Sequence, residues 1–188
     1  NKDITIFTMS RPEYLVKRVK GIGKGPKFIS SGKAEILKEM GVDMVALGAE
    51  SGSEWLRTNV LNRPMKQGIL EAASRVLMDT GIQVSLYNIL GFPFENREMM
   101  FDTVEQLWRI KPDRYAVRHL SPYPGTPLRD LCVEGGFIHP LYEDLPNEVT
   151  KSFLHEPILN LPEKIHRNKV VARSQKTKGF ETIEHPSK

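Results

Sequence analysis

A carboxylate and a guanidinium in this sequence stand where a small polar ligand could be bound. Glu50 directly follows the apolar run Asp43–Gly48, and Arg63 comes later, in a loop-like segment that includes Pro64. A partly buried carboxylate needs hydroxyls, amides or a cation to satisfy it, and a guanidinium can hold a carboxylate through two parallel hydrogen bonds. These two side chains therefore predict a ligand that carries hydrogen-bond donors together with an amino-acid-like carboxylate.

Local folding offers an alternative explanation for some of the same residues. Ser51 and Glu54 have the spacing of a Ser-x-x-Glu capping box, worth ~1 kcal/mol to a helix that begins there, and Gly52 could ease the turn. The capping box leaves Glu50 unexplained, which favours a ligand contact for this residue. For Arg63, a surface position near a helix start explains the residue as well as a ligand contact does, so both stay open.

Two loops rich in glycine and proline extend the predicted binding surface. Gly91 and Pro93 follow an apolar strand, so their loop can bring backbone close to a flat ligand without intervening side chains. The segment Ser121–Pro127 is too rich in proline and glycine for a helix or strand. We expect it to form a rigid wall at the rim, with Tyr123 directed at a ligand or a neighbour.

The elements that must position these residues alternate along the chain. A β-rich apolar run, followed by a turn and a helical pattern, recurs at Ile4–Thr8, Asp43–Gly48, Ile82–Leu90 and Arg114–His119. The clearest helix is predicted near residues 66–80, where apolar residues recur at helical spacing. The alternation predicts a parallel sheet covered by helices, with ligands at the carboxyl ends of its strands.

Such βα units fit either an open doubly wound sheet or a barrel. The dinucleotide-binding glycine fingerprint is absent, which favours the barrel, and the glycine-rich stretch 21–26 is interpreted as a connector because no phosphate-loop ending follows it. We therefore predict an α/β fold, a partial (β/α) TIM-type barrel of about four βα units over residues 1–138. The segment 139–188 is predicted to be an irregular, helix-containing carboxyl-terminal tail.

Composition narrows the classes of function. The chain is 39% hydrophobic and 27% charged, which is ordinary for a globular domain, and it has no apolar run long enough to span a membrane, so we expect a cytoplasmic protein. Cys132 is the one cysteine, which excludes a disulfide framework and predicts a packing role. The net charge of +4 resides in the tail from Lys151 onward, which has few aromatics, so nucleic-acid binding is not expected.

Four motifs occur in an order that resembles a known family. They are Gly48–Glu54, Asn62–Arg63, Ile89–Pro93 and Pro122–Leu128. Together they resemble the radical S-adenosylmethionine (SAM) enzymes of the Elp3/MiaB/NifB-like group, above all the branch with a cobalamin-binding domain. The resemblance covers about residues 4–138. It implies a radical SAM barrel that binds SAM and a 4Fe-4S cluster, with cobalamin as a further cofactor of that branch.

The resemblance also implies roles for individual residues. Glu50 matches the residue after the fourth barrel strand that hydrogen-bonds the ribose or methionine part of SAM, and Arg63 matches the arginine that holds the SAM carboxylate. The loop after the fifth strand matches the family's segment near adenine. The further cofactor-binding positions implied by the resemblance are Ser51, Tyr87, Asn88, Gly91 and Arg11.

The sequence departs from the family at the metal. Radical SAM enzymes hold the cluster through three cysteines, whereas this chain has one, in the wrong unit to replace them. Because the sequence also begins without Met, at Asn1, we expect a carboxyl-terminal piece of the barrel that is inactive alone. Its open sheet edges predict self-association. No residue of the chain is assigned a catalytic or metal-binding role.

The leading hypothesis is thus a fragment of an enzyme that cleaves SAM at a 4Fe-4S cluster to begin radical chemistry on an unidentified substrate. A second hypothesis is a half-barrel without a cluster that binds SAM, a nucleotide or a protein partner and catalyses nothing. A third is a phosphate-binding barrel of the aldolase type, which would bind phosphate at the Gly48 loop and which only the glycines support.

Overall fold

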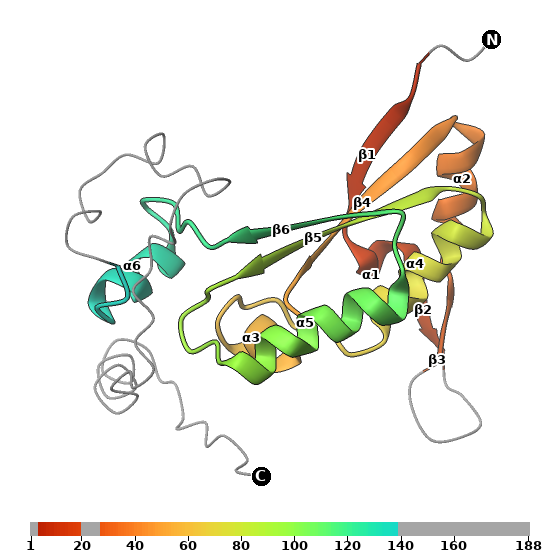
Figure 1. Cartoon of the computed structure of the whole chain (residues 1–188). Coiled ribbons are helices and arrows are strands. Elements are labelled where there is room, and N and C mark those ends of the chain that lie inside the picture. The colour runs from red at the N-terminus through yellow and green to blue at the C-terminus, as the bar shows by residue number, and fades with distance from the viewer. Residues whose placement is uncertain (1–3, 20–26, 139–188) are drawn as a thin grey trace. The chain divides into compact units, whose positions relative to one another are not determined.

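A parallel four-stranded sheet organises the amino-terminal part of the chain (Figure 1). The computed structural model describes residues 4–19 and 27–138. The strands are β1 (Ile6–Ser10), β4 (Val42–Glu50), β5 (Gln83–Leu90) and β6 (Arg114–His119). They lie in the order β1-β4-β5-β6, and every neighbouring pair is parallel. This confirms the predicted α/β class with a parallel sheet.

Helices follow the strands as the alternation predicted. Three of them connect successive strands of the sheet: α2 (Lys33–Glu39), α4 (Ile69–Asp79) and α5 (Arg97–Ile110). Two shorter helices, α1 (Pro12–Leu15) and α3 (Glu54–Asn59), lie in the loops after β1 and β4. Asn96 begins α5, since its side chain accepts a hydrogen bond from the backbone N–H of Met99.

The core lies between one face of the sheet and the helices. Val45 and Leu47 of β4 and Val84 and Leu86 of β5 share this face and are fully buried. The long helix α4 begins three residues later than the expected range and packs against them. Its core-facing residues include the predicted apolar stripe, which comprises Ile69, Ala72, Ala73, Val76 and Leu77.

A two-stranded antiparallel hairpin follows α1, and the sequence analysis predicted neither of its strands. Its strands are β2 (Val16–Val19) and β3 (Lys27–Ser30), and residues 20–26 between them lie outside the described part. Strands of four residues with basic side chains carry too little periodicity to be recognised in the sequence. The hairpin lies beside α4, where the ring of Phe28 approaches Gly68.

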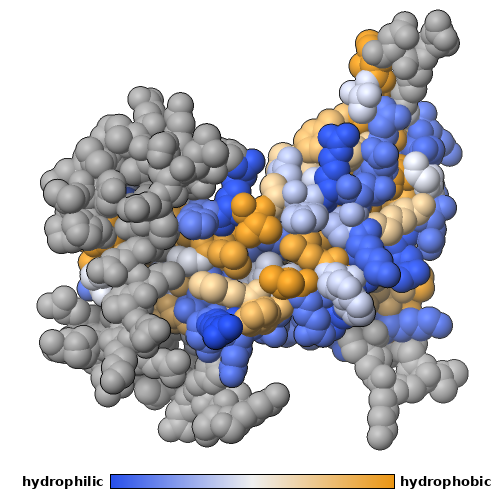
Figure 2. Space-filling view, viewed as in Figure 1, coloured by the Kyte–Doolittle hydropathy of each residue, from blue (hydrophilic) through white to orange (hydrophobic). Residues whose placement is uncertain are grey.

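Helix α5 presents an apolar surface that the sequence pattern did not separate from its core face. Figure 2 shows hydrophobic side chains gathered near the centre of this view, over α5 and β6. Phe101, Val104 and Trp108 of α5 are exposed, as is Val117 of β6. Leu107 of the same helix packs against the core.

The chain divides into two compact units, residues 1–119 and 120–188. The described part of the second unit contains α6 (Pro127–Glu134), which Thr126 caps by accepting from the backbone N–H of Arg129. Cys132 is buried in this unit, and burial raises its pKa to about 12, as expected for a packing residue. The predicted irregular tail, 139–188, lies outside the described residues. No described helix combines the length and apolarity that crossing a bilayer requires.

Candidate cofactor-binding site

The structure brings Glu50 and Arg63 together at the carboxyl end of β4. The Nη1 atom of Arg63 donates to Oε1 of Glu50 at 2.8 Å. A second carboxylate, that of Glu13 in α1, lies 3.7 Å from Nη2 of Arg63. The side chain of Arg63 is only 13% exposed, so this is a largely buried ionic cluster rather than a surface ion pair. The surface explanation for Arg63 therefore does not hold.

Gly48 makes room for this pair on one face of the sheet. A Cβ atom on Gly48 would lie 2.6 Å from Oε1 of Glu50 and 3.1 Å from Nη1 of Arg63. Tyr87 is the register partner of Gly48 on β5, and it lies on the same face of the sheet. Gly48 thus serves the packing of this ion pair. It leaves space that the carboxylate and guanidinium fill.

The backbone around the pair is held in conformations that side chains rarely adopt. Four non-glycine residues in the described part of the chain have positive φ, and three lie in the loops of the site: Glu50 (61°), Asn62 (48°) and Phe94 (67°). Such conformations cost of order 1–3 kcal/mol each and persist where surrounding contacts impose them. Their concentration around Glu50 and Arg63 is typical of a functional region.

Burial and pairing act against each other on Glu50. Desolvation raises the pKa of Glu50, while the charge and hydrogen bond of Arg63 lower it by a smaller amount. Within the described residues, Nε of Arg63 is buried and has no hydrogen-bond partner. The cluster therefore has an unused guanidinium donor and a carboxylate that would gain from further hydrogen-bond donors. A ligand with a carboxylate and hydroxyl or ammonium groups fits both requirements.

A buried arginine that the sequence reasoning missed ties the two site loops together. Arg57 of α3 is 1% exposed, and its guanidinium donates to the carbonyl oxygen of Ser51, next to Glu50. The same guanidinium donates from Nε and Nη2 to the carbonyl oxygen of Met65, at 3.3 and 3.2 Å. The loop after β4 and the loop that carries Arg63 are thus joined through one side chain. In the sequence, Arg57 looks like any polar residue of a short helix.

The predicted capping box is wrong in its details. Ser53, not Ser51, caps α3, because its Oγ accepts from the backbone N–H of Leu56. Ser51 is fully buried, and its hydroxyl accepts from the backbone N–H of Ser53. Glu54 accepts from the backbone N–H of Gln67. Ser51 therefore supports the turn locally, and the ligand contact that the resemblance implies for it stays a prediction.

Gly52 serves close packing rather than an eased turn. A Cβ atom here would lie 2.3 Å from the carbonyl carbon of Asp102 and 2.4 Å from the backbone nitrogen of Thr103. The N–H of Gly52 donates to Oγ1 of Thr103 at 2.8 Å. The loop after β4 consequently rests directly on the backbone of α5. This contact holds the loop that follows Glu50 against helix α5 of the next βα unit.

The loop after β5 is held by Glu95, a second residue that the sequence reasoning did not single out. Its Oε2 atom accepts from the backbone N–H groups of Gly91 and Phe92. Its Oε1 atom is buried and has no hydrogen-bond partner among the described residues. Burial raises the pKa of Glu95, and the two backbone hydrogen bonds lower it by less. Gly91 thus directs its N–H at Glu95, which fixes the start of the loop after β5.

The remaining predicted site residues separate in the structure. Tyr87 is half-buried on the face of the sheet that carries the Glu50 and Arg63 pair. Asn88 is 1% exposed and is the register partner of Glu50 on β5, and strand alternation places its side chain on the face of Leu86. Arg11 is exposed and precedes α1, without a side-chain capping bond. Of the three, Tyr87 is the one that shares the face of the candidate site.

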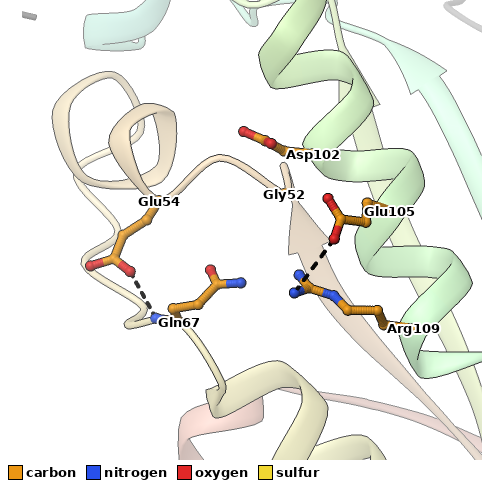
Figure 3. A pocket seen from close by; sticks show the side chains of 6 residues that line it. All are labelled: Gly52, Glu54, Gln67, Asp102, Glu105 and Arg109. Atoms are coloured by element: carbon orange, nitrogen blue, oxygen red, sulfur yellow. Dashed lines mark hydrogen bonds and ion pairs between the residues drawn. The ribbon is translucent and has the colours of Figure 1, made fainter. Parts of the chain in front are cut away.

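A polar pocket of about 270 Å³ lies between the loop after β4 and helix α5 (Figure 3). Its lining comprises Gly52, Glu54, Gln67, Asp102, Glu105 and Arg109. Arg109 lies 3.9 Å from Glu105 and 3.6 Å from Glu71, so the pocket already holds its own counter-charge. In the part of the chain that the structure describes, no group of three or more His, Cys, Asp or Glu residues could hold a metal ion. We assign no ligand to this pocket.

Comparison with known proteins supports the fold and its superfamily. No family model matches the chain. A biotin synthase from Bordetella avium (strain 197N) is 30% identical over 122 residues, which are 62% of this chain and 37% of that protein. Coproporphyrinogen III oxidase (HemN) from Escherichia coli, described as a radical SAM enzyme, superposes with a TM-score of 0.56 at 14% identity. That superposition covers 94% of this chain and 32% of the oxidase.

These likenesses bear on the fold of the chain and on the superfamily that it resembles. The chain has an α/β fold with a parallel sheet, similar to part of a radical SAM TIM-type barrel, and the findings together support the radical SAM superfamily. The chain spans about a third of the length of each protein it matches. Neither likeness distinguishes the Elp3/MiaB/NifB-like group or its cobalamin-binding branch, which the sequence motifs had suggested.

Proposed function

We propose that this chain is the SAM-binding part of a radical SAM enzyme. One observation carries the proposal: Glu50 and Arg63 meet over Gly48 at the carboxyl end of a parallel strand, where βα folds bind their ligands. This ion pair combines a carboxylate whose burial raises its pKa with a guanidinium whose Nε has no hydrogen-bond partner among the described residues. SAM offers the complementary groups, an ammonium and ribose hydroxyls together with a carboxylate.

The residues present fit SAM. Arg63 would bind the methionine carboxylate, and Glu50 would accept from the ammonium or from ribose hydroxyls. Tyr87 lies on the same face, and the Gly91 loop, held by Glu95, would approach the flat adenine. When bound and reductively cleaved, SAM supplies a carbon radical that removes a hydrogen atom from a substrate. The chain's own contribution is to bind and orient the cofactor.

The residues present do not fit a 4Fe-4S cluster. The chain has a single cysteine, Cys132, which is buried in the second unit. Cluster binding, SAM cleavage and the choice of substrate are therefore proposed for a longer protein, and this chain alone is expected to be inactive. The proposal for cobalamin rests on the sequence motifs only. Detectable SAM cleavage by the purified chain after cluster reconstitution would contradict the expected inactivity.

A half-barrel that binds SAM or a nucleotide without catalysis is the second candidate. The observation that favours it is the same single cysteine, since a binding protein needs no cluster. The two candidates share the SAM site and differ in whether the protein also binds a 4Fe-4S cluster next to SAM. Glu50→Gln and Arg63→Gln, placed in a longer protein that contains this chain, distinguish them: an enzyme loses SAM affinity and turnover together.

SAM binding to the 188-residue chain tests the shared part of both candidates. Titration calorimetry with SAM and with S-adenosylhomocysteine should give saturable binding, and Glu50→Gln or Arg63→Gln should weaken it about tenfold or more, which corresponds to about 1.4 kcal/mol. Glu105→Gln, which alters a partly exposed ion pair with Arg109, is the matched control and should leave binding unchanged. Equal SAM affinity of wild type, Glu50→Gln and Arg63→Gln would refute the assigned site.

A further inference from the structure

The hairpin formed by β2 and β3 carries a concentration of positive charge that the proposed SAM site does not use. Between Tyr14 and Ala34 the sequence has six Lys or Arg residues and no Asp or Glu. Outside this segment, residues 1–150 contain 13 basic and 19 acidic residues, so this remainder carries a net negative charge. Charge is thus segregated onto the hairpin rather than spread evenly.

The described cations of the hairpin are exposed and lie on both of its faces. Lys17 and Lys27 share one face, because Lys17 pairs with Ile29 and Val19 pairs with Lys27 in the antiparallel register. Arg18 lies on the other face, opposite Phe28. All three basic residues are exposed, and none of them forms an ion pair with a carboxylate within the described residues. The face of Arg18 and Phe28 is the one beside α4, so Lys17 and Lys27 lie on the open face of the ribbon.

An aromatic ring and a further cation stand at the base of the hairpin. Tyr14 is 54% exposed, and Nζ of Lys33 lies 5.1 Å from the centre of its ring. Ser31 closes the base by donating from its hydroxyl to the carbonyl oxygen of Tyr14 at 2.8 Å. Exposed aromatic rings among basic side chains are the composition that stacks on bases and contacts phosphates.

We propose that the hairpin is a docking surface for the phosphate backbone of a nucleic acid. Four exposed cations, Lys17, Arg18, Lys27 and Lys33, lie along this two-stranded ribbon and at its base, and they suit the phosphates of a backbone that runs along its open face. Lysine is common in phosphate contacts and is depleted in the cores of protein interfaces, which favours a nucleic acid over an acidic protein.

Fluorescence anisotropy with the full 188-residue chain tests the proposal. The probes are a labelled single-stranded RNA and a labelled DNA duplex of equal length, which distinguish single-stranded from duplex backbone. Four phosphate contacts predict that affinity for the RNA falls about 50-fold between 50 and 200 mM salt. The double variant Lys17→Glu with Lys27→Glu should weaken binding by about tenfold or more at the lower salt concentration.

The matched control reverses the same amount of charge elsewhere. Lys164→Glu with Lys169→Glu in the tail changes the net charge equally and should leave binding close to the wild-type level. Thermal melts monitored by circular dichroism show whether the reversed charges disturb folding. If they do, Lys17→Gln with Lys27→Gln replaces the hairpin variant, because it removes the charges without reversing them. Three results would overturn the proposal: no binding of either probe, loss of binding in the tail variant instead of the hairpin variant, or equal competition by polyglutamate.

Discussion

The carboxylate of Glu50 lies directly over Gly48, so that a Cβ atom on Gly48 would come within 2.6 Å of Glu50 Oε1. The atom in the way is the end of a flexible side chain, which can move. Gly48→Ala should therefore displace Glu50 from Arg63 and lower the free energy of unfolding, because a largely buried ion pair is broken, but by less than a clash with backbone would. We expect SAM affinity to fall about tenfold or more, measured by calorimetry beside a urea melt. Unaltered SAM affinity in a folded variant would contradict the assigned role of the pair.

Gly52→Ala provides the contrasting case. The added methyl group would meet the backbone of Asp102 and Thr103 at 2.3 to 2.4 Å, and backbone of a packed helix cannot move aside as a side chain can. We expect the free energy of unfolding to fall by about 3 kcal/mol, measured by urea denaturation. Two variants of Thr103 isolate the hydrogen bond from the steric effect. Thr103→Ser retains the acceptor for the Gly52 N–H, whereas Thr103→Val leaves this donor unpaired and should cost about 1–3 kcal/mol.

Arg57 should couple stability to SAM binding. Its burial and its hydrogen bonds to Ser51 and Met65 predict that Arg57→Gln loses about 2–4 kcal/mol of stability, because two carbonyl groups lose their donors. Arg57→Lys keeps the charge but cannot reach both loops. This variant should therefore retain part of the stability and bind SAM more weakly than wild type. Calorimetry at a temperature where all variants are folded measures this. If Arg57→Lys binds SAM as tightly as wild type, Arg57 does not position the site.

The sequence was sufficient to predict the parallel sheet and the meeting of Glu50 with Arg63. Both follow from position: the strands are apolar runs between helical patterns, and the carboxyl ends of parallel strands converge on one edge. Which of the two neighbours Tyr87 and Asn88 faces the site was harder to predict from the sequence. In a strand only one of two neighbours can face the site, and that face became clear once Leu86 was seen to point at the helices.

The features that sequence reasoning missed depend on distant contacts. Arg57 is recognisable only when its burial is known, since an arginine in a short helix normally points to solvent. The need for Gly52 comes from α5, some fifty residues farther along the chain. The β2 and β3 hairpin has strands of four residues each, too short for periodicity to reveal. In each case the information lies in a tertiary neighbour rather than in local spacing.

Glu95 gives a pH-dependent prediction for the loop that holds Gly91. Burial raises the pKa of this carboxyl group above 4.5 in the folded state, so the folded protein retains a proton that the unfolded chain has already released. The contribution of Glu95 to stability is therefore greatest below pH 4.5 and declines as the pH rises through its folded pKa. Glu95→Gln keeps an acceptor for the N–H groups of Gly91 and Phe92 but cannot ionise.

The stability of Glu95→Gln relative to wild type should consequently increase between about pH 4.5 and pH 7, as measured by urea denaturation at a series of pH values. Glu95→Ala is the control, because it removes the acceptor as well as the charge and leaves the two backbone N–H groups unpaired. This variant should be less stable than Glu95→Gln at every pH. A difference between Glu95→Gln and wild type that does not vary with pH would mean that the carboxyl group is better solvated than its burial indicates, and that the loop is held by other contacts.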